Sequence, residues 1–140
     1  MSKVAVVYWS GTGNTEAMAK AVEEGAKSAG AEVTVFAPSE FDVSKVDQFD
    51  AIAFGCPAMG AEVLEEEEFE PMFSAVESAL KGKKIAIFGS YGWGDGQWMR
   101  EWEERCSNDG AVLVAEPLMV NEAPDDEGTA ACQALGAALV

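Results

Sequence analysis

Histidine is absent from the sequence, and this absence excludes several kinds of enzyme site at once. Ser-His-Asp and Cys-His nucleophiles need an imidazole base, and imidazole–zinc centres need it as a ligand. Cysteine is scarce as well: Cys56, Cys106 and Cys132 form no C-x-x-C pair, and their number is odd. The cysteine pattern therefore argues against a disulfide scaffold and against a clustered metal site.

Long apolar runs are lacking too. No run approaches the ~18 residues that a membrane-spanning helix needs. At the start of the chain, Lys3 is followed by the short apolar run Val4–Trp9 and then by a glycine-rich loop, which is not the pattern of a secretory signal. We therefore expect one soluble globular domain over residues 1–140, with a cytoplasmic location.

Basic residues are few: 9 Lys and Arg oppose 25 Asp and Glu, which gives a net charge of −16. Such a surface repels nucleic acid and anionic membranes, because binding to both depends on basic residues. It can attract and steer partner proteins with basic patches, or it can simply keep a small protein in solution. The clustering of the acid favours partners. Six glutamates fall within nine positions: Glu62, Glu65, Glu66, Glu67, Glu68 and Glu70.

Hydrophobic periodicity predicts an alternation of strands and helices. The expected strands are Lys3–Tyr8, Glu32–Phe36, Ala51–Cys56, Lys83–Gly89 and Ala111–Val120, the last interrupted by Pro117. The expected helices contain the stripe Met18–Ala29 and the segments Phe69–Leu80, Gln97–Asn108 and Asp125–Leu139. This alternation predicts an α/β fold with a parallel sheet. Ligands of such folds bind at the carboxyl ends of the strands, here residues 9–15, 57–64 and 90–96.

The first of these loops, Ser10–Thr15, offers three hydroxyls, an amide side chain and two glycines before a helix. Backbone N–H groups at a helix N-terminus bind phosphate, although a plain βα turn with a Ser/Thr cap is the alternative. A Walker loop is excluded because no lysine lies between Lys3 and Lys20. Glu16 occupies the position where a dinucleotide fingerprint needs a small residue. The loop also lacks the cysteine and arginine of a low-molecular-weight phosphatase, which leaves a site for one terminal monophosphate.

The two later loops are rich in glycine and aromatic residues. Trp93 lies between glycines, where its indole either covers a flat ligand or packs on the surface of its own loop. Met59 either contacts an aromatic ring through its thioether or fills space.

Taken together, these motifs resemble those of the short-chain flavodoxins. The resemblance rests on Ser-Gly-Thr-Gly-Asn-Thr at 10–15, Ala-Met-Gly-x-Glu at 58–62 and Ser-Tyr-Gly-Trp-Gly-x-Gly at 90–96, and it extends over essentially the whole chain. It implies a flavodoxin-like, doubly wound, five-stranded parallel sheet in the order 2-1-3-4-5 with helices on both faces. It also implies a low-potential one-electron carrier, not an enzyme, that binds FMN noncovalently and cycles between semiquinone and hydroquinone.

The resemblance also implies roles for individual residues. Ser10–Thr15 would hold the FMN phosphate, while Trp93 and Met59 would pack on the outer and inner faces of the isoalloxazine. Glu62 would accept a hydrogen bond from flavin N3, and the Gly60 carbonyl would turn towards N5–H in the semiquinone. No catalytic or metal-ligating residue is expected. The expected cofactor contacts are Ser10, Gly11, Thr12, Gly13, Asn14, Thr15, Pro57, Ala58, Met59, Gly60, Ala61, Glu62, Ser90, Tyr91, Gly92, Trp93, Gly94 and Asp95.

Two residues depart from the family pattern. Ala61 occupies a turn position where relatives often carry Gly, Asn, Asp or Ser, and a type II turn would need φ > 0 there. Pro57 occupies a position where some relatives have a serine, so one hydroxyl contact to the phosphate would be missing.

The resemblance further implies a monomer whose partners are redox proteins, both reductases and electron acceptors, with basic docking patches. The alternative is an FMN-dependent quinone or nitro reductase of the same fold, which needs an open site and usually longer loops. A receiver-type signalling domain is excluded, because Trp9-Ser10 and Ser90-Tyr91 occur where it needs an acidic pair and a lysine.

Overall fold

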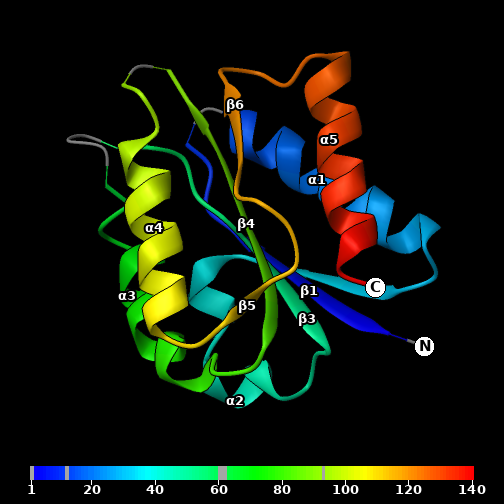
Figure 1. Cartoon of the computed structure of the whole chain (residues 1–140), viewed down its shortest axis with the longest axis vertical. Helices are drawn as coiled ribbons and strands as arrows, with labels where there is room; N and C mark the ends of the chain where they lie inside the picture. Colours follow the sequence, from blue (N-terminus) through cyan, green and yellow to red (C-terminus); the bar gives the residue numbers. More distant parts are fainter. Residues whose placement is uncertain (1, 12, 60–62, 93) are drawn as a thin grey trace.

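The computed structural model describes residues 2–11, 13–59, 63–92 and 94–140. Its centre is a parallel sheet with the strand order β2-β1-β3-β4-β5 (Figure 1). A sixth strand, β6, pairs with the second half of β4, beyond β5. The strands are β1 (Lys3–Tyr8), β2 (Glu32–Phe36), β3 (Ala51–Gly55), β4 (Lys84–Tyr91), β5 (Val112–Leu113) and β6 (Leu118–Asn121). The predicted order and the parallel α/β class are confirmed.

Helices cover both faces of the sheet (Figure 1). One face carries α1 (Asn14–Ser28) and α5 (Asp126–Ala138), and the other carries α2 (Val43–Val46), α3 (Phe69–Val76) and α4 (Gln97–Asn108). Short 3-10 turns follow β2 and α3, at η1 (Pro38–Glu40) and η2 (Glu77–Ala79). Within the described ranges, no helix is long and apolar enough to cross a membrane.

The central strands are buried on both faces because their side chains alternate between the two helical layers. In β1, Val4 and Val6 pack in the layer of α1 and α5, while Ala5 and Val7 pack in the layer of α3 and α4. All four are fully buried. This two-sided burial explains why the strand is a continuous apolar run in the sequence.

The expected last strand, Ala111–Val120, is in fact two short strands. β5 ends at Leu113, and the chain pairs with β4 again only from Leu118, directly after Pro117. Proline has no N–H to donate to the ladder, and Pro117 is the last residue of the break between the two strands. The segment Pro38–Val46, for which the sequence predicts no element, contains η1 and α2.

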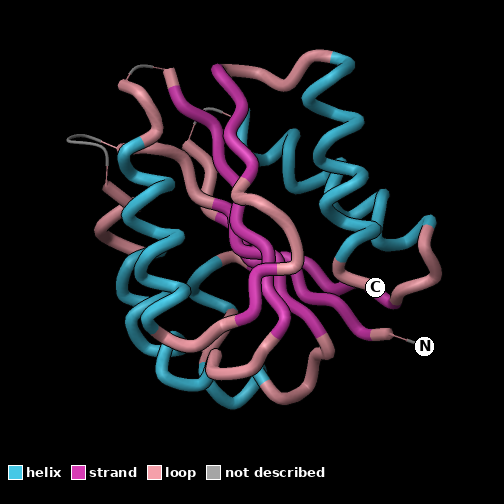
Figure 2. The backbone as a smooth tube through the Cα atoms, in the orientation of Figure 1, coloured by secondary structure: helices cyan, strands magenta, loops and turns pink. Residues whose placement is uncertain are grey.

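The parallel arrangement brings the loops after β1, β3 and β4 to the same edge of the sheet, at the upper left of Figure 2. The beginning of α1 lies at this edge as well, since α1 follows β1 directly.

Candidate cofactor site

A cavity of about 450 Å³ opens at this edge of the sheet. Its volume lies within the ~300–1,000 Å³ that is typical of small-molecule sites. It is lined by residues at or just beyond the carboxyl ends of β1, β3, β4 and β6: Trp9, Gly11, Asn14, Pro57, Ala58, Met59, Ser90, Tyr91, Gly92, Glu122 and Ala123. The edge at which the sequence predicts a ligand therefore does contain a cavity.

The loop before α1 is organised by the Ser10 hydroxyl. Its Oγ accepts hydrogen bonds from the N–H of Gly13 at 3.1 Å and from the N–H of Glu16 at 3.2 Å. Gly13 has φ of 93°, a left-handed conformation that glycine adopts without strain. The first N–H groups of a helix have no partner within the helix, so the beginning of α1 is suited to an anion.

A chain of hydrogen bonds joins this loop to β4. Thr15 is fully buried, and its Oγ1 accepts from the N–H of Ser90 at 3.3 Å. The Ser90 hydroxyl donates to the carbonyl of Glu122 at 2.7 Å, and the Glu122 N–H donates to the carbonyl of Tyr91 at 2.8 Å. Glu122 has φ of 59°, and these two bonds hold its backbone in that conformation. Thr15 and Ser90 thus join the beginning of α1, the end of β4 and the residue that follows β6.

The loop after β3 is fixed from both ends. The Ala58 N–H donates to the Ser90 carbonyl at 3.1 Å, and Met59 and Val63 exchange two backbone hydrogen bonds of 2.9 and 3.0 Å. Below the loop, the Trp98 indole donates to the Cys56 carbonyl at 3.1 Å. The backbone on either side of residues 60–62 is therefore anchored.

The predicted contacts are distributed as follows. Gly11, Asn14, Pro57, Ala58, Met59, Ser90, Tyr91 and Gly92 line the cavity. Ser10 and Gly13 line a neighbouring hollow. Thr15 is fully buried and does not line the cavity, and Gly94 and Asp95 do not line it either. The predictions for Thr12, Gly60, Ala61, Glu62 and Trp93 fall outside the described residues.

Three residues of the lining are absent from the expected contacts, namely Trp9, Glu122 and Ala123. Trp9 lies in the segment 9–15, where the carboxyl-end rule predicts a ligand, but the resemblance assigns it no contact. Glu122 directly follows β6, and that strand could not be separated from β5 by pattern alone.

The acidic segment after this loop does not act as one cluster, which corrects the expectation that its carboxylates together face partners. Glu65 is 5% exposed, and its carboxylate accepts the N–H groups of Glu67, Glu68 and Phe69, each at 2.8 Å. Burial alone would raise the pKa of the Glu65 carboxyl, but these three donors lower it below its usual value. Glu65 therefore forms part of the fold.

Glu70 is also engaged. It forms an ion pair with Arg105 at 2.8 Å, and this hydrogen-bonded guanidinium lowers the pKa of the Glu70 carboxyl. Glu66, Glu67 and Glu68 remain exposed, and Glu68 accepts a hydrogen bond from the Trp9 indole at 2.8 Å. Among the described glutamates of the segment, these three are the most exposed.

Comparison with known proteins identifies the family. Residues 6–136 match the flavodoxin family. The chain is 48% identical over 121 residues to a flavodoxin of Clostridium beijerinckii, covering 86% of this chain and 88% of that protein. It is 47% identical over 135 residues to the flavodoxin of Megasphaera elsdenii, covering 96% of both chains. The chain belongs to the flavodoxin family.

The solved structures agree with this assignment. The solution structure of two-electron reduced Megasphaera elsdenii flavodoxin is similar with a TM-score of 0.89 and covers 97% of each chain. A flavodoxin from the domain Archaea is 28% identical, with a TM-score of 0.85 over 96% of this chain and 94% of that chain. Flavodoxins are FMN-binding electron-transfer proteins and not enzymes, so the expected cofactor and function are confirmed and the reductase alternative is not favoured.

Proposed function

We propose that this flavodoxin holds FMN in the cavity at the carboxyl edge of the sheet and passes single electrons between redox proteins. The observation that carries the proposal is the meeting of a cavity of about 450 Å³ with the helix N-terminus of α1. When bound, FMN supplies one-electron chemistry. The contribution of the protein is to bind, orient and electrostatically tune the cofactor.

The residues present fit this cofactor. Asn14 and Gly11 place the phosphate loop in the wall of the cavity, and Met59, Tyr91 and Gly92 line its other side. The loop has no lysine or arginine, so neutral hydroxyls and N–H groups must hold the phosphate. We assign the phosphate to Ser10–Thr15 and the ring to the space between the loops 57–62 and 90–95. The individual contacts of Thr12, Gly60, Ala61, Glu62, Trp93, Gly94 and Asp95 stay predictions.

Negative charge around the site favours a low potential. Glu122 lines the cavity, and the exposed residues Glu66–Glu68 follow the loop at 57–62. At ~10 Å and an effective dielectric constant of ~40, each carboxylate opposes one added negative charge by roughly 0.8 kcal/mol before salt screening. Several such charges disfavour full reduction of the flavin.

The same charge points to the partners. We infer that the protein acts as a single-domain cytoplasmic monomer over residues 1–140, and that it docks on basic patches of reductases and electron acceptors. A net charge of −16 disfavours binding to nucleic acid and to anionic membranes. Docking is then steered by long-range attraction and weakened by salt.

The assignment of the phosphate is tested by comparing FMN with riboflavin, which lacks the phosphate. Asn14→Ala should weaken FMN binding by about ten- to a hundredfold, because one hydrogen bond to a charged group contributes ~1.5–3 kcal/mol. Riboflavin binding should stay unchanged, since its ring and ribityl chain do not need the loop. Fluorescence quenching titrations give both constants.

The matched control is Asn108→Ala, an exposed asparagine at the end of α4. It should leave both flavins unaffected. Equal losses for FMN and riboflavin in Asn14→Ala would show that the loop does not hold the phosphate.

A further inference from the structure

A second hollow, of about 670 Å³, lies beside the cofactor cavity. It is bordered by the end of β1, the loop before α1, the segment that follows β2, and Glu68. Trp9 and Gly11 contribute to both spaces, so the two are neighbours. Ser10, Gly11 and Gly13, to which we assign the FMN phosphate, form one side of the hollow, whereas the residues from Val35 to Glu40 on the other side have no role in the proposed FMN site.

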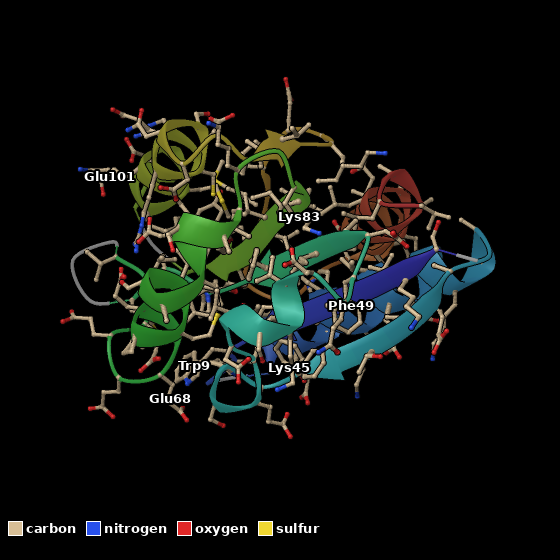
Figure 3. The ribbon with its side chains drawn as sticks, turned by 90° about the horizontal axis from the view of Figure 1, so that it is seen from below. Trp9, Lys45, Phe49, Glu68, Lys83 and Glu101 are labelled. Atoms are coloured by element: carbon tan, nitrogen blue, oxygen red, sulfur yellow. The ribbon has the colours of Figure 1, made fainter. Side chains whose placement is uncertain are left out.

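The walls of this hollow are partly aromatic and firmly supported. Phe36, at the end of the edge strand β2, packs on Phe41 and Phe49 with ring centroids 5.3 and 5.7 Å apart. Trp9 is half-buried and held by its hydrogen bond to Glu68, and the two side chains lie together in Figure 3. Pro38 closes the wall from η1.

Three carboxylates border the hollow, and each is oriented by a neutral donor. Glu68 accepts from the Trp9 indole at 2.8 Å, and Glu40 accepts from the N–H of Ala37 at 2.8 Å. Glu16 accepts from the Tyr8 hydroxyl at 3.4 Å. Neutral donors fix these groups without cancelling their charge. Among the described residues that line the hollow, none is a lysine or an arginine.

We propose that this hollow receives an arginine side chain of the protein partner during electron transfer, a proposal that rests on the function proposed above. A guanidinium stacks on aromatic faces and binds carboxylates through paired hydrogen bonds, so it matches both the walls and the rim. On the side of the hollow away from the phosphate loop, Glu40 and Glu68 oppose an anionic ligand. A partner anchored here lies next to the cofactor cavity, because Trp9 borders both.

The first test uses small probes on the FMN-loaded protein. N-acetyl-arginine amide and its uncharged isostere N-acetyl-citrulline amide are titrated at equal ionic strength, and the indole N–H signals are followed by ¹⁵N NMR. The arginine probe should shift the Trp9 signal saturably, and the citrulline probe should not. Trp98 and Trp102 are buried and should stay unmoved, so they serve as internal references.

Variants localise the effect. Glu16→Gln/Glu40→Gln removes two charges from the rim but keeps an amide oxygen for each donor. It should weaken the arginine response at least fivefold. The matched control is Glu24→Gln/Glu32→Gln, which removes two exposed carboxylates from α1 and from the opposite end of β2. The control should retain the response.

The second test measures electron transfer to cytochrome c, a basic acceptor used here as a probe. At low salt, the rim variant should lower the second-order rate constant at least threefold more than the control variant, with the flavin absorption spectrum unchanged. Equal losses in the two variants would reduce the effect to net charge and overturn the proposal. Equal shifts of Trp9 with both probes would overturn it as well. Failure of the wild-type protein to reduce any acceptor would instead refute the proposed function, and the NMR titration would still decide on the hollow.

Discussion

Glu65 allows a quantitative test of the distinction between structural and partner-facing carboxylates. Its carboxylate accepts three consecutive backbone N–H groups at 2.8 Å, at the point where α3 begins. The N–H of Phe69 is buried, while those of Glu67 and Glu68 are only partly shielded and can be hydrated when the carboxylate is removed. Removing the carboxylate therefore leaves the Phe69 N–H buried without a partner, whereas water can replace part of the two bonds to Glu67 and Glu68.

The expected cost follows from these bonds. An unsatisfied buried N–H costs ~1–3 kcal/mol, and the loss of a helix cap costs ~0.5–2 kcal/mol. Glu65→Ala should therefore lower the free energy of unfolding by about 2–4 kcal/mol, allowing for incomplete additivity. Glu65→Gln keeps one acceptor oxygen but turns an amide N–H₂ towards the Glu67 N–H, and should cost about half as much. Glu66→Ala, at the exposed neighbour, should stay within about 0.5 kcal/mol.

The pH dependence identifies the charge as the cause. The folded state lowers the pKa of Glu65, so its contribution to stability is complete above the unfolded-state value of ~4.3. The contribution is lost as the pH falls through the lower pKa of the folded state. The difference between wild type and Glu65→Gln should be full at pH 7 and should narrow below pH ~4. Urea unfolding at a fixed FMN concentration measures it, since bound ligand adds to stability. A cost equal to that of Glu66→Ala, or one that does not narrow at all as the pH falls below ~4, would refute the reasoning.

Two further predictions concern stability. Burial, together with the neighbouring Glu77, raises the pKa of Asp109 to about 6, because only the protonated form can share a hydrogen with Glu77. The stability that protonated Asp109 provides is complete below the unfolded-state pKa of ~3.9 and is lost as the pH rises through about 6. Asp109→Asn should therefore be more stable than wild type at pH 8, and in urea titrations the gain should shrink as the pH falls from about 6 to ~4; a gain independent of pH would contradict the cause. Gly136→Ala should lower the free energy of unfolding by about 1–3 kcal/mol, because the added Cβ would lie 2.0 Å from the Val22 carbonyl oxygen, between α5 and α1. Thermal unfolding measures this change, and an unchanged midpoint would show that the two helices can move apart without loss of stability.

Most of the fold could be predicted because its signals are local. β1 and β2 begin and end where the β-branched runs do, and α4 spans the predicted Gln97–Asn108. The break at Pro117 was visible, but its consequence was not. Whether a proline interrupts one strand or separates two depends on how β4 is paired on that side, which is a tertiary property. α2 has only four residues and therefore no helical period to detect.

The acidic segment shows where sequence reasoning about the site ends. A run of glutamates is expected to form a solvated face, and the pattern has no feature that separates Glu65 from Glu66. In the structure, one carboxylate turns inward onto three N–H groups and the next stays exposed. The direction of each side chain is set by the backbone entering α3, beside Cys56, whose sulfur accepts the Glu65 N–H at 3.3 Å. Such contacts join residues nine positions apart, so residue type alone cannot assign them.

The location of the cofactor cavity, in contrast, follows from topology rather than from residue type. Once the strands are parallel, the loops after β1, β3 and β4 must meet, and any ligand of these loops lies at that edge. What topology leaves open is how rigidly the loops are held. In this structure Ser90 connects them: its N–H donates to the Thr15 hydroxyl oxygen, and its hydroxyl donates to the Glu122 carbonyl at 2.7 Å. A residue predicted to contact the cofactor thus also joins the beginning of α1 to the end of β4, so its replacement would disturb the cavity even if it touched no ligand.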